Sequence, residues 1–74
     1  MEERIKKIMG GILKVDWAII NENFSQESFA AWDSIAQLNL VVEFEREFGI
    51  ELEPHEIGSM VDFATTVATI SQKM

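Results

Sequence analysis

With 74 residues, 47% of them hydrophobic, the chain is long enough for one small globular domain and too apolar to be disordered. Its 13 acidic and 6 basic residues give a net charge of −7. This charge argues against nucleic acid or an anionic membrane as the partner. It favours partner proteins that have basic patches. Cysteine is absent and histidine occurs once, so disulfides, thiolate metal sites and histidine metal clusters are excluded. No apolar run is long enough for a membrane span, and the N-terminus lacks the apolar core of a signal peptide.

The first predicted element is an amphipathic helix over residues 2–14. Lys14 suits its negative C-terminal end, while Gly10 and Gly11 are each expected to weaken it by about 1 kcal/mol. The apolar residues that recur at helical spacing are Ile5, Ile8, Met9, Ile12 and Leu13.

Residues 15–33 show no sustained period and are predicted to form a long connection. In so small a domain, a loop of this length tends to be functional or to contain a short turn of helix. Several of its apolar residues are expected to hold the loop against the core: Trp17, Ile19, Ile20, Phe24 and Phe29.

A second helix is predicted over residues 34–48. Ser34 to Gln37 fits a capping box, S-x-x-Q, with Asp33 as the competing N-cap, and Gly49 suits the left-handed residue that ends a helix. Its apolar residues exceed one face, so some must meet solvent, a partner or a ligand. They are Ile35, Leu38, Leu40, Val41, Val42, Phe44 and Phe48, the last expected at the packed end of the helix.

Two further helices complete the predicted fold. Pro54 suits the start of a short helix over about 54–59, and Asp62 can cap a last helix that carries Phe63, Val67 and Ile70 on one face. No pair of alternating strands with a hairpin turn occurs. The prediction is therefore an all-α, four-helix bundle of three longer helices and one short, as a single domain over 1–74, with a long loop between the first and second helices.

The sequence offers little material for catalysis or for binding metal. A lone His55 at a helix start is usually a solvated surface residue, and Glu43, Glu45 and Glu47 are expected to form a solvated face. No calcium-loop pattern occurs. Neither an enzyme nor a metal site is expected.

Ser34 is the residue with the clearest chemical potential. It places a hydroxyl at a helix N-terminus after the long loop, where unpaired N–H groups and the helix dipole favour a negative group such as a phosphate ester. The plainer interpretation is that Ser34 is only an N-cap.

Three blocks of the chain, in register, resemble the acyl carrier protein family over nearly its whole length. The stretch from Glu2 to Ile8 resembles the family's first helix. Trp32-Asp33-Ser34-Ile35 resembles its Asp-Ser-Leu attachment motif, and Leu40 to Leu52 resembles its second helix and the turn that follows.

The resemblance implies a covalent 4′-phosphopantetheine on Ser34, transferred from coenzyme A by a separate magnesium-dependent phosphopantetheinyl transferase. The terminal thiol of that arm would carry acyl groups as thioesters. The chain would then be a discrete carrier and not an enzyme. It would deliver acyl intermediates to partner enzymes of fatty-acid, polyketide or related biosynthesis, as a monomer in the cytoplasm.

The resemblance also implies that the second helix is the docking surface. Asp33 would help to present the site, Ile35, Leu38 and Val42 would be apolar contacts, and Glu45 would be an acidic one. The partners would be the transferase and the enzymes that load and transfer acyl groups, each with a basic docking patch. A pocket for the acyl chain would lie between the second helix and its packed neighbours.

Two alternatives remain open. Trp32 is either a core residue beneath the loop or a residue that acts near the prosthetic group. The whole chain could also be a small acidic helical module that binds a basic partner without any prosthetic group. That interpretation explains charge and amphipathicity equally well but leaves Asp33-Ser34 as a coincidence.

Overall fold

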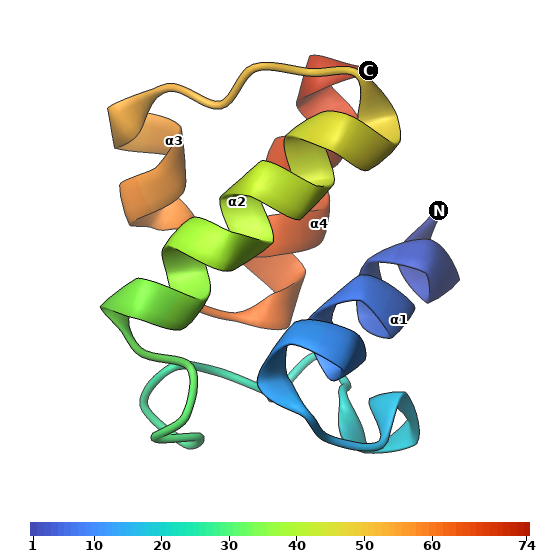
Figure 1. Ribbon diagram of the computed structural model, residues 1–74, viewed down its shortest axis with the longest axis vertical. Helices are drawn as coiled ribbons and strands as arrows, with labels where there is room; N and C mark the ends of the chain where they lie inside the picture. The colour runs from blue at the N-terminus through green and yellow to red at the C-terminus, as the bar shows by residue number, and fades with distance from the viewer.

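A computed structural model describes all residues, 1–74, and contains helices but no strands. Its elements are α1 (Glu2–Leu13), a short 3-10 helix η1 (Trp17–Ile19), α2 (Ser34–Phe48), α3 (Pro54–Ser59) and α4 (Phe63–Lys73). In Figure 1, α2 crosses the front of the molecule, α1 and α3 lie on either side of it, and α4 lies behind. The predicted all-α fold with three longer helices and one short is confirmed. None of these helices has the length and apolarity to cross a bilayer.

The helices begin and end where local signals place them. Gly49 adopts φ 64° after α2, and its amide donates to the Glu45 carbonyl at 2.9 Å. Pro54 opens α3, and the Asp62 carboxylate caps α4 by accepting from the Thr65 amide at 2.7 Å. Only α1 ends one residue early, because Lys14 takes the left-handed conformation at φ 60°.

The cap of α2 differs from the capping box predicted from Ser34 and Gln37. Asp33 is the N-cap, and its Oδ1 accepts from the Ala36 amide at 2.9 Å. Gln37 points inward and is only 7% exposed. The competing assignment, Asp33 as the cap, is therefore correct, and Ser34 becomes the first residue of the helix.

The core lies where the apolar faces of α1, α2 and α4 meet under the long loop. Within the loop, Ile20 and Phe24 are buried and Phe29 is half-buried, as expected. Trp17 and Ile19 are 40% and 52% exposed, so their predicted role in the core is wrong: the 3-10 helix that holds them lies on the surface. The main core residues from the helices are Ile5, Met9, Leu13, Leu40, Val41, Phe44, Phe63 and Ile70.

The long loop is fixed to the connection between α3 and α4. The Phe63 amide donates to the Phe24 carbonyl at 2.8 Å, and the Gln26 amide donates to the Val61 carbonyl at 2.9 Å. Further along, the Trp32 ring stacks on Phe24 with centroids 5.8 Å apart. The segment that leads into α2 is therefore held by the body of the domain.

Arg4 joins α1 to the C-terminal end of α2. Its guanidinium forms an ion pair with Glu47 and lies 4.7 Å from the ring centroid of Phe48. Phe48 packs against Phe44 and is half-buried, so it is less enclosed than the sequence suggested.

The two glycines of α1 are expected to respond in opposite ways to alanine. A Cβ at Gly10 would lie 3.0 Å from the Trp17 Cβ and from the Val15 carbonyl oxygen, whereas a Cβ at Gly11 would meet nothing within 4 Å. Gly11→Ala should raise stability by about 0.5–1 kcal/mol because alanine is the better helix former. Gly10→Ala should lower stability, since the chain at Val15 and Trp17 would have to move. Thermal melts check this, and a lower melting temperature for Gly11→Ala would contradict it.

Candidate functional site

Ser34 is exposed at the first position of α2 and is available for modification. Because Asp33 supplies the cap, the Ser34 hydroxyl takes part in none of the hydrogen bonds within the chain. The amides of the first helical turn and the helix dipole lie beside it, and both stabilise negative charge. The position therefore fits a phosphate ester on the serine oxygen.

An open hollow of about 500 Å³ lies next to Ser34, between α2, the end of the long loop and α3. Its lining includes both polar and apolar residues. Its lining consists of Gln26, Trp32, Asp33, Ser34, Gln37, Leu38, Ile57, Gly58 and Val61.

A buried chain of hydrogen bonds forms the inner wall of this hollow. The Trp32 indole N–H donates to Gln37 Oε1 at 2.7 Å, and Gln37 Nε2 donates to the carbonyls of Ile57 and Met60, both at 3.1 Å. Trp32 is 2% exposed, so it is a core residue that also borders the site. The role of Gln37 was missed from the sequence, although it shares the helical spacing of the buried residues Val41 and Phe44.

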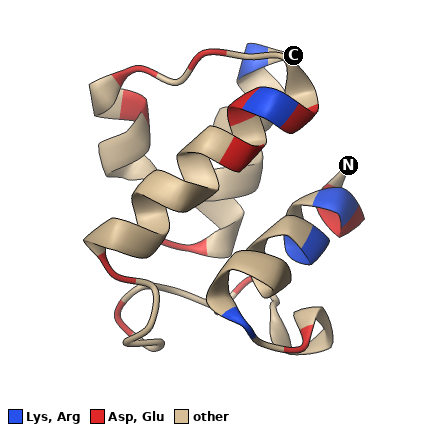
Figure 2. Cartoon of the chain, in the orientation of Figure 1, with Lys and Arg blue, Asp and Glu red and all other residues tan.

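An apolar strip runs along α2 from Ser34. Ile35, Leu38 and Val42 are 72%, 62% and 52% exposed. In Figure 2 the first half of α2 carries no charge, and the nearest charged residues are Asp33 before it and Glu43 after it. The surplus of apolar residues predicted for this helix therefore faces solvent, and it does so beside the candidate serine.

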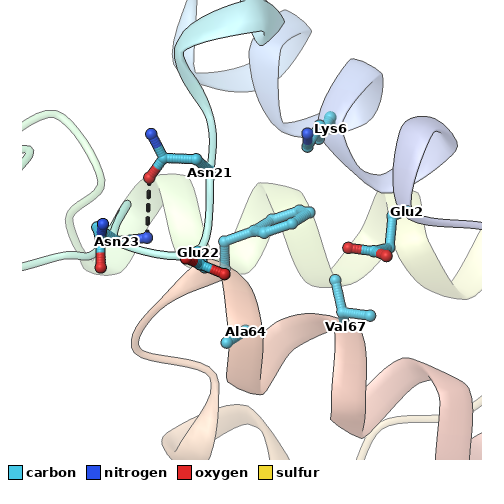
Figure 3. A pocket seen from close by; sticks show the side chains of 8 residues that line it. Glu2, Lys6, Asn21, Glu22, Asn23, Ala64 and Val67 are labelled. Carbon is cyan, nitrogen blue, oxygen red and sulfur yellow. Dashed lines mark hydrogen bonds between the residues drawn. The ribbon is translucent and has the colours of Figure 1, made fainter.

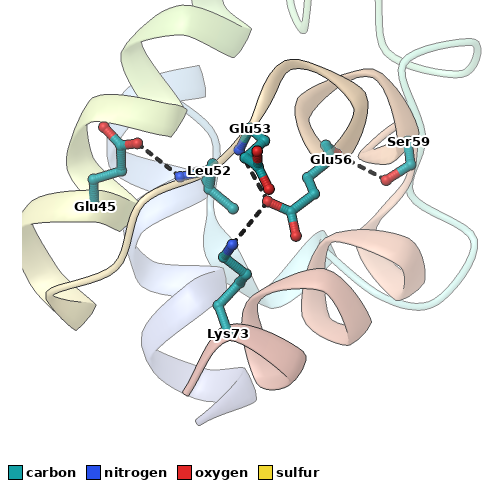
Figure 4. A network of polar contacts seen from close by, with 6 residues as sticks. All are labelled: Glu45, Leu52, Glu53, Glu56, Ser59 and Lys73. Carbon is teal, nitrogen blue, oxygen red and sulfur yellow. Dashed lines mark hydrogen bonds and ion pairs between the residues drawn. The ribbon is translucent and has the colours of Figure 1, made fainter.

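Glu45, the acidic residue expected on the docking surface, is half-buried. Its Oε2 accepts from the Leu52 amide at 2.9 Å, so the side chain also holds the turn after α2 (Figure 4). A partner that pairs with the Glu45 carboxylate must therefore do so while this carboxylate still accepts from the Leu52 amide.

The short helix α3, on the far side of the hollow, is attached to the end of α4. Glu56 accepts from the Glu53 amide at 2.9 Å and pairs with Lys73 at 3.1 Å, as Figure 4 shows. The backbone hydrogen bond from Glu53 and the Lys73 ammonium hold the pKa of Glu56 below its ordinary value. The position of α3 therefore depends in part on the charge of one carboxylate.

We expect the Glu56–Lys73 pair to make the stability of the fold depend on pH in the acidic range. Because the pKa of Glu56 is lower in the folded chain than in the unfolded one, its contribution is present at neutral pH and is lost as the pH falls through the folded value. Glu56→Gln should flatten the acid side of the melting-temperature profile, whereas Glu51→Gln, at an exposed residue, should keep the wild-type slope. Equal slopes for all three proteins would contradict the role given to Glu56.

No cluster of side chains in the structure suits a metal ion. No group of three potential metal ligands occurs, and His55 is exposed. A second hollow of about 550 Å³ lies between α1, the loop and α4 (Figure 3). Its charged side chains are Glu2, Lys6 and Glu22, none of which lines the hollow beside Ser34.

Comparison with known proteins identifies the family. The family model described as "Phosphopantetheine attachment site" matches residues 3–73. The chain belongs to this family. The fold of this carrier is similar to the solution NMR structure of a holo acyl carrier protein from Geobacter metallireducens, with a TM-score of 0.86 and 19% sequence identity. That match covers 97% of this chain and 83% of the other.

The family and the fold together define the general role of the chain. It is a carrier protein that bears a covalently attached 4′-phosphopantetheine and interacts with enzymes. The carrier domain itself is not catalytic.

Proposed function

We propose that Ser34 is the attachment point and that the chain carries acyl intermediates for enzymes of fatty-acid, polyketide or related biosynthesis. The observation that supports this most strongly is the exposed Ser34 hydroxyl, unbonded at the start of α2 and adjacent to an apolar strip. Residues 1–74 would act as one carrier domain, as a monomer in the cytoplasm.

Attachment would follow from the position of Ser34 Oγ. A phosphopantetheinyl transferase would use this oxygen as the nucleophile: the oxygen–phosphorus bond forms, the pyrophosphate bond of coenzyme A breaks, and the nucleotide part leaves. The proton of the hydroxyl passes to a base on the transferase. Once bound, the group supplies a thiol that holds acyl cargo as a thioester. The role of the chain is to present the oxygen, and Asp33 contributes by fixing the first turn of α2.

The apolar strip would be the docking surface for the transferase and for enzymes that load and transfer acyl groups. Ile35, Leu38 and Val42 would supply its apolar contacts, because each is more than half exposed and all three share one face of α2. The acidic residues at its ends, Asp33 and Glu45, would face basic patches on these enzymes and speed their association.

The charge of Glu45 can be tested without disturbing its structural bond. Glu45→Gln keeps an oxygen that accepts from the Leu52 amide but removes the negative charge, so the melting temperature should stay close to wild type. Modification by the transferase should slow, and the wild-type rate should fall as salt rises. Glu2→Gln, on α1, is the matched control. Equal rates for the two variants would remove Glu45 from the docking surface.

The deciding experiment for the proposed function is intact mass after incubation with coenzyme A and a broad-specificity phosphopantetheinyl transferase. We expect the mass to rise by one phosphopantetheinyl group and the gain to map to Ser34. A gain on another serine would overturn the assignment of the site. Absence of any gain would overturn the proposed attachment to Ser34.

A further inference from the structure

The interior between α2 and α3 is crossed by one polar side chain, Gln37. It is 7% exposed, and both ends of its amide are engaged: Oε1 accepts from Trp32, and Nε2 donates to the carbonyls of Ile57 and Met60. This bridge therefore links the end of the long loop to the C-terminal end of α3. It passes through the region in which the family resemblance implied a pocket for the acyl chain.

The bridge also separates the outer hollow from the core. Ser34, Trp32 and Gln37 all line the hollow, so a chain attached to Ser34 meets the bridge before it reaches the interior. Leu40 and Met60 have no exposed surface, belong to the core and do not line the hollow. The three hollows in the structure all open to the surface.

Displacing the bridge would leave several buried polar groups without partners. In the folded chain no buried side-chain nitrogen or oxygen lacks a hydrogen bond. An alkyl chain that pushed Gln37 aside would deprive the Trp32 N–H of its acceptor. It would also deprive the carbonyls of Ile57 and Met60 of the hydrogen bonds that the Gln37 amide donates. Such losses oppose the gain from burying apolar surface, because an unsatisfied group keeps its desolvation penalty.

We propose that the Trp32–Gln37 bridge closes the interior to acyl chains, so that this carrier holds short, polar acyl groups that stay in the outer hollow. The hollow suits such cargo, since Gln26 and Asp33 on its lining can hydrogen-bond to hydroxyl or amino substituents. This inference rests on the proposed function, with Ser34 as the attachment point. It names the class of cargo that the proposed function leaves open.

The test uses the full chain loaded by a transferase with either hydroxyacetyl- or octanoyl-coenzyme A, with intact mass confirming each product. Two quantities are then compared: the melting temperature and the NMR signal of the Trp32 indole N–H. The indole of Trp17, which is 40% exposed on η1, is the internal reference. We expect the two loaded forms to melt at the same temperature and to share the Trp32 signal, because neither cargo enters the core.

A variant that opens the bridge provides the positive control. Gln37→Leu removes all three hydrogen bonds of the bridge. Its octanoyl form should therefore melt several degrees above its hydroxyacetyl form. Gln72→Leu, at an exposed residue, should behave like wild type. If Gln37→Leu does not fold, Trp32→Phe removes the indole donor and keeps an aromatic side chain, and should give the same ordering. A higher melting temperature for octanoyl-loaded wild type, with a shifted Trp32 signal, would overturn the inference. Failure of both cargoes to attach would instead overturn the proposed function.

Discussion

Ser34→Ala should abolish the mass gain from phosphopantetheinyl transfer while leaving the melting temperature nearly unchanged. The cap bond of α2 comes from Asp33, and the Ser34 hydroxyl has no partner within the chain, so its removal breaks no hydrogen bond. The helix could even gain slightly, because alanine has the higher helix propensity. The measurements are intact mass and a thermal melt of the same sample.

Two control variants separate the loss of the Ser34 nucleophile from the loss of the helix cap. Ser71→Ala alters another exposed serine and should be modified at the wild-type rate. Asp33→Ala removes the cap and should lower stability by about 1 kcal/mol while keeping the nucleophile. Recovery of the added mass on Ser34→Ala would end the assignment of Ser34.

Phe44→Ala should unfold the domain or nearly so, whereas Leu38→Ala should leave it folded and impair its modification. Phe44 has no exposed surface, and truncating a buried phenylalanine costs about 3–5 kcal/mol, close to the whole stability of a domain this small. Leu38 is 62% exposed, so its truncation removes little buried area. We expect Val42→Ala to resemble Leu38→Ala, since Val42 is 52% exposed.

The measurements are paired thermal melts and transferase rates. Phe48→Ala should fall between the two extremes, because Phe48 is half-buried against Phe44 and Arg4. A large loss of stability at Leu38, with a normal rate per folded molecule, would assign that residue to the core and remove the apolar strip from the docking surface.

The helices could be predicted because their limits depend on neighbouring residues. Asp62 caps α4 through Thr65, three positions away, and Gly49 ends α2 through its own φ angle. The long loop could not be resolved in the same way. Ile20 is buried and the adjacent Ile19 is 52% exposed, and no local pattern distinguishes them. Their burial depends on where the loop meets residues 61–63, a contact between segments far apart in the chain.

The candidate site shows the same division. The position of Ser34 and the excess of apolar residues on α2 are visible in the sequence. The partner of Gln37 is not, because its amide satisfies the carbonyl of Met60, 23 residues away. The sequence also favoured Gln37 as a capping residue, and the choice between Ser34 and Asp33 as N-cap depended on the backbone geometry at the end of the loop.

The closeness of the apolar strip to Ser34 has a kinetic consequence for the proposed carrier. Ile35 and Leu38 lie one and four residues beyond Ser34, so an enzyme seated on the strip also covers the origin of the arm. Two enzymes therefore cannot occupy the carrier at the same time, and each must leave before the next can bind. Under this arrangement the dissociation rate of every complex limits the flux through the carrier. Weak, quickly released contacts along α2 would then serve turnover better than tight ones.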